Sequence, residues 1–199
     1  MPKHPSTAQP HAPATLVVIG VSRGGLDALS TLLASLQAPL PLPVVIAQHR
    51  ATDSDDTLAV MLASRTGHDF RSPVDKEPLG AGRVYLAPPD YHLLVERGCL
   101  SLSTEDVICH ARPSVDALFE TAADAYGPGV VAVILTGENA DGAQGAARVK
   151  ARGGRLLVQD PATAESPSMP EAARAAARPD LVASIAALAA QLREWCAGK

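Results

Sequence analysis

Residues 16–25 read Leu-Val-Val-Ile-Gly-Val-Ser-Arg-Gly-Gly, and this stretch decides how the chain folds. Its first six residues form an unbroken apolar run rich in β-branched side chains, which is typical of a strand buried on both faces. After the turn, leucines recur at helical spacing, at positions 26, 29, 32, 33 and 36. Strand, tight turn and helix therefore follow one another, as in the first unit of a parallel α/β sheet.

Further apolar runs predict the rest of this sheet. Residues 44–47, 129–136 and 156–158 are also predominantly apolar and are predicted as further buried strands. The intervening sequence predicts helices at residues 55–64, 114–126, 141–152, 171–177 and 181–196. Residues 83–103 differ, because short alternating segments are split there by turn residues, and they predict a small antiparallel meander. The expected fold class is α/β: a doubly wound, mostly parallel sheet flanked by helices, with this meander inserted.

Length and composition fit a single domain. A chain of 199 residues with 47% hydrophobic residues can bury a large core but leaves little room for a second domain. Residues 1–13 are rich in Pro, Ala and His without periodicity, which predicts a disordered tail before one domain at residues 14–199. Aromatic residues make up only 3%, so the core must be packed from Ala, Leu, Val and Ile.

Charge and cysteine content exclude several classes of partner. The net charge is −4 with no run of Lys and Arg, which disfavours nucleic acid. No segment resembles a signal peptide or a membrane span, so we expect a cytoplasmic protein without membrane insertion. The sequence does not indicate an oligomeric state. The three cysteines lack a C-x-x-C spacing, which disfavours a disulfide framework and a zinc site; they are Cys99, Cys109 and Cys196.

Reactive side chains follow three of the expected strands. Ser22 comes directly after the first strand, His49 follows the second, and the turn at residues 136–142 carries Asp141. Because the carboxyl ends of parallel strands share one edge of the sheet, where ligands bind, these side chains should meet there. A nucleophile, a base and an orienting carboxylate are the parts of a serine hydrolase.

The residues around Ser22 leave two types of site open. Residues 20–24 satisfy G-x-S-x-G in the strand, turn and helix context of a nucleophile elbow, but the same helix N-terminus could bind a phosphate. A dinucleotide or P-loop motif is absent, and an α/β-hydrolase would place Asp before His, whereas here His49 comes first. The remaining histidines form no metal-ligand pair, and the adjacent Cys109 and His110 make a poor catalytic dyad, so we expect no metal site.

Six blocks of sequence carry a family resemblance. In chain order they are residues 18–25 (Val-Ile-Gly-Val-Ser-Arg-Gly-Gly), 47–50 (Ala-Gln-His-Arg), 84–92 (Val-Tyr-Leu-Ala-Pro-Pro-Asp-Tyr-His), 112–119 (Arg-Pro-Ser-Val-Asp-Ala-Leu-Phe), 134–143 (Ile-Leu-Thr-Gly-Glu-Asn-Ala-Asp-Gly-Ala) and 168–170 (Ser-Met-Pro). Together they resemble the catalytic domain of the CheB-type protein-glutamate methylesterases. The resemblance implies a serine esterase that hydrolyses γ-glutamyl methyl esters on chemoreceptor helices, releases methanol, and in many members deamidates receptor glutamines.

The resemblance also assigns roles to residues. It places the catalytic triad on Ser22, His49 and Asp141 and requires no metal or organic cofactor. The backbone N–H of Glu138 would help to form the oxyanion hole. The other residues expected to flank the site or to contact the substrate, a methylated chemoreceptor or related sensory protein, are Arg23, Gly24, Asn139, Arg50, Arg112 and Met169.

The chain departs from the family pattern beside the nucleophile. Arg23 stands where members usually carry Thr, and Glu138 where they often carry Met, so these two side chains either pair across the cleft or both point into solvent. Residues 1–13 cannot contain the receiver domain that chemotaxis members commonly carry, and we expect a stand-alone catalytic domain. The alternative is a repurposed, catalytically weak module that binds an acidic receptor helix in another signalling pathway.

Overall fold

The computed structural model describes residues 12–55 and 57–197. A tail is predicted at residues 1–13, and residues 1–11 of it lie outside the described residues. Within the described part of the chain, no helix is long and apolar enough to cross a membrane.

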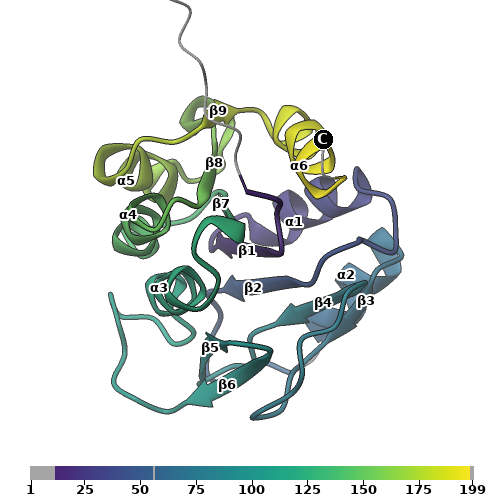
Figure 1. Ribbon diagram of the computed structural model, residues 1–199. Helices are drawn as coiled ribbons and strands as arrows, with labels where there is room; N and C mark the ends of the chain where they lie inside the picture. The colour runs from purple at the N-terminus through teal and green to yellow at the C-terminus, as the bar shows by residue number, and fades with distance from the viewer. Residues whose placement is uncertain (1–11, 56, 198–199) are drawn as a thin grey trace, which may run out of the picture.

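The described residues form a seven-stranded parallel sheet, seen edge-on in Figure 1. In spatial order its strands are β3 (Asp69–Arg71), β4 (Arg83–Leu86), β2 (Val44–Gln48), β1 (Leu16–Val21), β7 (Val130–Ile134), β8 (Arg155–Gln159) and β9 (Leu181–Ala183). From β1 the chain adds β2, then the edge strand β3, and then β4 between β2 and β3; it returns to the other side of β1 to add β7, β8 and β9 in order. The strand order therefore reverses between β1 and β7, which confirms the doubly wound α/β fold.

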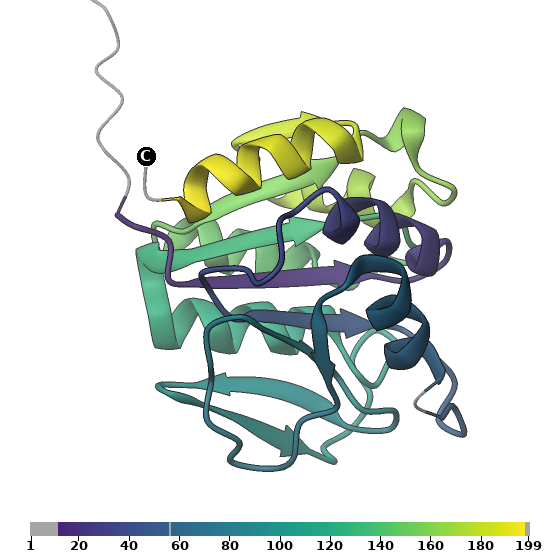
Figure 2. The same cartoon turned by 90° about the vertical axis from the view of Figure 1, so that its right-hand side faces the viewer.

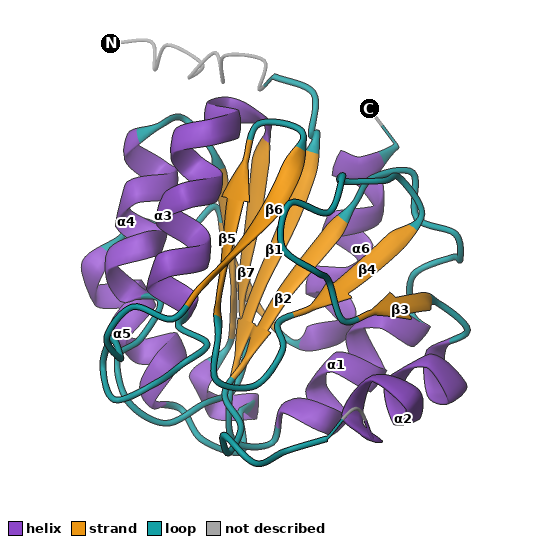
Figure 3. Cartoon of the chain, turned by 90° about the horizontal axis from the view of Figure 1, so that it is seen from below, coloured by secondary structure: helices purple, strands orange, loops and turns teal. Residues whose placement is uncertain are grey.

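Helices cover both faces of the sheet (Figure 3). One face carries α1 (Gly25–Ala34), α2 (Thr57–Thr66) and α6 (Ile185–Cys196), and the other carries α3 (Val115–Tyr126), α4 (Ala143–Ala151) and α5 (Ser168–Ala176). Alternate residues of β1 face opposite cores: Val17 and Ile19 pack toward α1, whereas Leu16 and Val18 pack toward α3. Because both faces are buried, the strand is apolar at every position, as its sequence indicates.

The antiparallel insertion is smaller than predicted. It is a hairpin of β5 (His92–Glu96) and β6 (Cys99–Ser103) that packs against α3. The expectation that residues 83–87 belong to this meander is wrong, because β4 pairs in parallel with both β2 and β3. Val84, Tyr85 and Leu86 are fully buried, which explains why they form an internal strand of the main sheet.

The two edge strands were not predicted. β3 and β9 are three residues long and only partly buried, so they lack an apolar signal of their own. β9 occupies the start of the segment predicted as one helix at 181–196, and α6 begins only at Ile185, after its N-cap Ser184. Two short 3₁₀ helices, η1 (Gly127–Gly129) and η2 (Pro161–Thr163), complete the described elements.

The carboxyl ends of the strands meet at one edge of the sheet, toward which the arrowheads of β1, β2 and β7 point in Figure 2. In the ladder, Val21 lies opposite Gln48, and Gly20 lies opposite Ile134. The residues that follow these three strands therefore emerge side by side, at the point where the strand order reverses. Ligands of doubly wound sheets bind at such a point.

Candidate active site

His49 and Asp141 form a close pair at this edge. His49 Nε2 lies 2.7 Å from Asp141 Oδ2, although the two residues are far apart in the chain. The Asp141 side chain is fully buried, and the His49 side chain is 12% exposed. Because an ionised carboxylate only accepts hydrogen bonds, Nε2 carries the ring proton and Nδ1 is left as the basic nitrogen of the neutral imidazole.

Asp141 is held as a carboxylate by the first turn of α3. Its Oδ1 accepts hydrogen bonds from Ser114 Oγ at 2.8 Å and from the Asp116 N–H at 2.9 Å, and its Oδ2 accepts from the Val115 N–H at 2.7 Å. Burial alone raises the pKa of Asp141, but the hydrogen bonds from His49 and from these backbone groups outweigh it and hold the pKa below its usual value. The positive end of the helix acts in the same direction.

Ser22 lies at a tight turn between β1 and α1. Its N–H donates to Thr136 O at 3.0 Å, and its carbonyl accepts from the Gly25 N–H at 2.9 Å. Gly24 has a φ of 75°, a left-handed conformation that glycine adopts without strain. His49 comes directly after Gln48, the residue that pairs with Val21 across the sheet. The His49 N–H donates to Val21 O at 3.1 Å. The nucleophile and base candidates are therefore the first residues beyond two hydrogen-bonded strands.

The turn after β7 packs directly against Ser22. A Cβ on Gly137 would lie 2.8 Å from Ser22 Cβ and 2.0 Å from Met169 Sδ, so only glycine fits there. The Gly137 N–H is already used by Ser166 O at 3.0 Å, which makes the next amide, that of Glu138, the candidate donor for an oxyanion. This turn is thus fixed between the nucleophile on one side and α5 on the other.

Met169 takes a different place from the one expected. Its side chain is only 1% exposed and packs against Gly137, and its N–H donates to Gly137 O at 3.0 Å. These contacts give Met169 a part in positioning the turn rather than an open surface for substrate. Asn139 has a related part, because its Oδ1 accepts from the Asp141 N–H at 2.8 Å and so orders the turn that presents Asp141.

Arg23 and Glu138 form an ion pair. Arg23 Nε lies 2.7 Å from Glu138 Oε1, which confirms the hypothesis that the two side chains pair. The pair joins the turn after β1 to the turn after β7 beside Ser22, and both side chains are more than half exposed. The Glu165 carboxylate lies against Gly24, because a Cβ placed on this glycine would be 2.6 Å from Glu165 Oε2. Two carboxylates, those of Glu138 and Glu165, therefore lie beside the turn that carries Ser22.

A pocket of about 370 Å³ opens beside His49. Arg50 and Arg112 both line it, but their guanidinium groups also bind the protein itself. Arg50 Nη2 donates to Ala87 O at 2.6 Å, and Arg112 Nε donates to Asp90 Oδ1 at 3.0 Å. The remaining lining residues come from the segment after His49, the loop before α3 and Asn139: Ala51, Thr52, Val107, His110 and Ala111.

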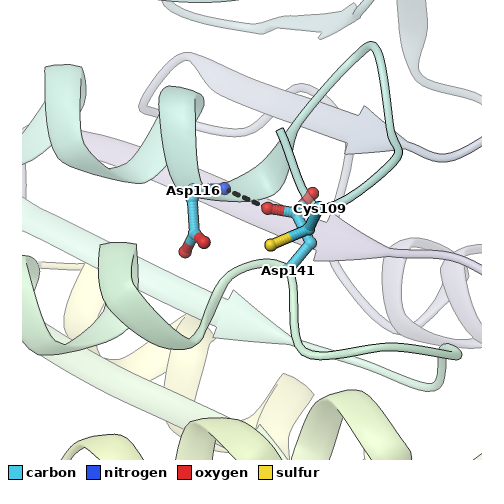
Figure 4. Close-up of side chains that lie close together, drawn as sticks. All are labelled: Cys109, Asp116 and Asp141. Atoms are coloured by element: carbon cyan, nitrogen blue, oxygen red, sulfur yellow. Dashed lines mark hydrogen bonds between the residues drawn. The ribbon is translucent and has the colours of Figure 1, made fainter. Parts of the chain in front are cut away.

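A group of possible metal ligands lies at the same place. Figure 4 shows the Cys109 thiol and the Asp116 and Asp141 carboxylates beside the start of α3. Their possible ligand atoms all lie within 4.8 Å of one another. Burial, together with both carboxylates, raises the pKa of the Cys109 thiol. The oxygens of Asp141 already accept four hydrogen bonds. This donor set does not fit a cation.

Asp116 is a buried carboxyl that is not among the residues predicted for the site. Its side chain is 4% exposed, and Oδ1 accepts from the Gly145 N–H at 2.7 Å. Burial raises the pKa of Asp116 to about 6, and the charge of Asp141 adds to this. A pKa above the unfolded value means that the folded state binds the proton more tightly, so Asp116 costs stability as the pH rises through this range.

We therefore expect Asp116→Asn to stabilise the protein at pH 8 by about 1–3 kcal/mol, at about 1.4 kcal/mol for each pKa unit. The amide oxygen can still accept from Gly145. At about pH 3 the carboxyl is largely protonated in both the folded and the unfolded state, and most of the gain should vanish. Urea unfolding of both proteins at the two pH values measures this, and an equal difference at both would contradict the assignment.

Other residues of the site were not predicted either. Ser114 is the N-cap of α3, where its Oγ accepts from the Ala117 N–H at 3.3 Å, and the same hydroxyl donates to Asp141 Oδ1. Gln48, Thr136 and Ser114 all lie at element ends on this edge of the sheet. Position is the one signal that could have found them, because the partners of their side chains are distant in sequence.

Comparisons with known proteins agree with the geometry. The family model described as CheB methylesterase matches residues 17–192. A Nocardioides protein named protein-glutamate methylesterase/protein-glutamine glutaminase is 40% identical over 178 residues, which cover 84% of this chain and 48% of the relative. A Leptospira interrogans protein whose name carries the same two activities is 42% identical over 174 residues, covering 87% of this chain and 90% of the relative.

A solved structure shares the fold. The crystal structure of the Thermotoga maritima CheB methylesterase catalytic domain matches with a TM-score of 0.86 at 33% sequence identity. The match covers 92% of this chain and 99% of the Thermotoga chain. The likeness therefore extends over the whole catalytic domain of that protein.

Proposed function

The chain belongs to the CheB methylesterase family, and from this premise we propose that it hydrolyses γ-glutamyl methyl esters on methylated chemoreceptor-type proteins with Ser22 as nucleophile. The observation that carries the assignment of residues is the 2.7 Å contact between His49 Nε2 and the buried Asp141 carboxylate. It lies at the sheet edge where Ser22 begins the turn into α1. The family makes the chain a carboxylic ester hydrolase, which favours catalysis over a purely binding module.

The first half of the reaction transfers the glutamyl group to Ser22. Ser22 Oγ attacks the ester carbonyl while His49 Nδ1 takes the hydroxyl proton. The tetrahedral intermediate then collapses, the bond to the methoxy oxygen breaks, and the same proton passes to this oxygen, so that methanol leaves. In the second half His49 Nδ1 takes a proton from water as the water oxygen attacks the acyl carbon. The bond from this carbon to Ser22 Oγ then breaks, the proton passes from His49 to Ser22 Oγ, and the γ-carboxylate leaves.

Asp141 keeps the imidazole in the productive tautomer. Its hydrogen bond fixes the proton on Nε2, so Nδ1 is the nitrogen free to act as base. The lowered pKa of Asp141 keeps it ionised throughout the reaction, where it stabilises the transient imidazolium. In this account the oxyanion is stabilised by the Glu138 N–H and by the N-terminus of α1, whose dipole favours negative charge.

The same acyl chemistry extends to glutamine. Attack on a γ-carboxamide gives the same acyl-enzyme with ammonia as leaving group, and the names of the relatives include this glutaminase activity. We propose that both substrates use the same three side chains. Mass spectrometry of a methylated receptor incubated with the protein tests the proposed ester hydrolysis. Each hydrolysed ester lowers the mass of the receptor by one CH₂ unit, and no change of mass would reject the esterase activity.

The Arg23–Glu138 pair should influence the rate through charge. The amide proposed for the oxyanion belongs to Glu138, whose own carboxylate would repel that oxyanion if Arg23 did not neutralise it. We expect Arg23→Ala to lower kcat about threefold to tenfold, a modest effect because solvent screens an exposed pair. Adding Glu138→Gln should restore most of the loss. Equal kcat values in the double and the single variant would contradict this coupling.

A further inference from the structure

Gln48 lies between the nucleophile and the base. It is the last residue of β2, is 7% exposed, and pairs with Val21 across the sheet. Its Nε2 donates to Ser22 O and to His49 O, both at 2.9 Å. One buried side-chain amide therefore connects the peptide units of the two residues that must exchange a proton.

The orientation of this amide is fixed. Both Nε2 hydrogens are used by the two carbonyl oxygens, and turning the amide over would place Oε1 against the same two acceptors. On the other side, an ideal Cβ on Gly25 would lie 1.9 Å from Oε1, so the start of α1 closes over the side chain. Within the described part of the chain, buried Oε1 has no hydrogen-bond partner. A buried acceptor without a partner costs stability, so stability alone does not explain an amide here.

The bridge acts on the geometry that the reaction needs. Ser22 O accepts from Gln48 on one side and from the Gly25 N–H at 2.9 Å on the other, which fixes the peptide that carries the nucleophile. A base must lie within about 3 Å of the hydroxyl whose proton it takes. A displacement of only about 1 Å can cost about a hundredfold in rate.

We propose that Gln48 is a positioning residue that sets the distance between Ser22 and His49 by bridging their carbonyl oxygens. This inference rests on the proposed hydrolysis, since it assigns the residue a part in that reaction. Gln48 does not touch the substrate in this account. Its contribution comes from holding two elements of the fold in register at the site.

The decisive variant is Gln48→Leu, which keeps the approximate shape and removes both donors. We expect kcat for methanol release to fall about 10- to 100-fold, with KM changed less than about threefold, because the side chain orients groups and does not bind substrate. The matched control is Tyr85→Phe. The Tyr85 hydroxyl is also buried and bonds two backbone groups, Gly80 N–H at 2.9 Å and Pro78 O at 3.0 Å, in another part of the sheet.

Both variants should lose thermal stability, but only Gln48→Leu should lose kcat. If its kcat falls no further than that of Tyr85→Phe while the wild-type protein is active, the positioning role is wrong and the proposed hydrolysis stands. If the wild-type protein releases no methanol from a methylated receptor, the proposed function itself fails. The two failures are therefore distinguishable.

Gln48→Glu provides a second test should the leucine variant not fold. A carboxyl of the same size can donate to at most one of the two carbonyl oxygens, so the bridge between Ser22 and His49 is broken. We expect kcat to fall by at least about tenfold with KM changed less than about threefold. Wild-type kcat in this variant would overturn the inference.

Discussion

Replacing Ser22 with alanine should abolish nearly all methanol release, with a loss of kcat of about a million-fold if the site behaves as other serine hydrolases do. The substitution removes only the oxygen that forms the acyl bond. Its backbone contacts, the N–H to Thr136 O and the carbonyl to the Gly25 N–H, remain available. Methanol release from a methylated receptor, followed over hours, measures the residual rate.

Ser30→Ala provides the matched control for this variant. Ser30 lies on α1, and its hydroxyl donates to Leu26 O within the same helix, so its loss should leave kcat within about twofold of the wild type. Circular dichroism of both variants checks that the fold is retained. Turnover by Ser22→Ala at the wild-type rate would rule out the acyl-enzyme mechanism.

Asp141→Asn should cost about ten-thousand-fold in kcat, as the equivalent change does in a serine protease. An asparagine that donates its amide N–H to His49 Nε2 favours the tautomer with the proton on Nδ1, which can no longer act as base. The same change also removes an acceptor from the start of α3, where Val115 and Asp116 donate to the carboxylate. Part of the loss should therefore appear as lower thermal stability.

The kinetic and structural effects of this variant can be separated. Asp124→Asn is the control, because Asp124 is a surface carboxylate paired with Arg148 and Arg152, and its loss should not change kcat. Measuring kcat well below the melting temperature of each variant isolates the effect on the reaction. A loss smaller than tenfold for Asp141→Asn would mean that the carboxylate has only a structural role.

Sequence patterns predicted the parts of the fold that are buried on both faces. β1, β2 and β7 have continuous apolar sequences because helices cover both sides of the sheet, and the residues after these strands form the site. A continuous apolar sequence could not identify the edge strands β3 and β9, and it could not assign β4 to the main sheet. A short strand at an edge gains its structure from its neighbour, and a four-residue apolar segment fits a parallel strand as well as a hairpin.

The site also has a part that the sequence could predict and a part that it could not. Ser22, His49 and Asp141 could be proposed because each follows a strand and carries a recognisable chemical group. The arrangement around them depends on contacts over long sequence distances: Ser114 with Asp141, Gln48 with Ser22, and Met169 with Gly137. Such contacts leave no local pattern, and only the folded chain shows that Met169 is buried under the turn.

The proposed activation of Ser22 by His49 is tested most directly by labelling with a fluorophosphonate, a reagent that reacts with activated serine hydroxyls. Peptide mapping by mass spectrometry should place a single adduct on Ser22 in the wild-type protein, and His49→Ala should lose this adduct because the base is missing. Labelling of a different residue, or equal labelling of Ser22 in His49→Ala, would contradict the claim that His49 activates Ser22.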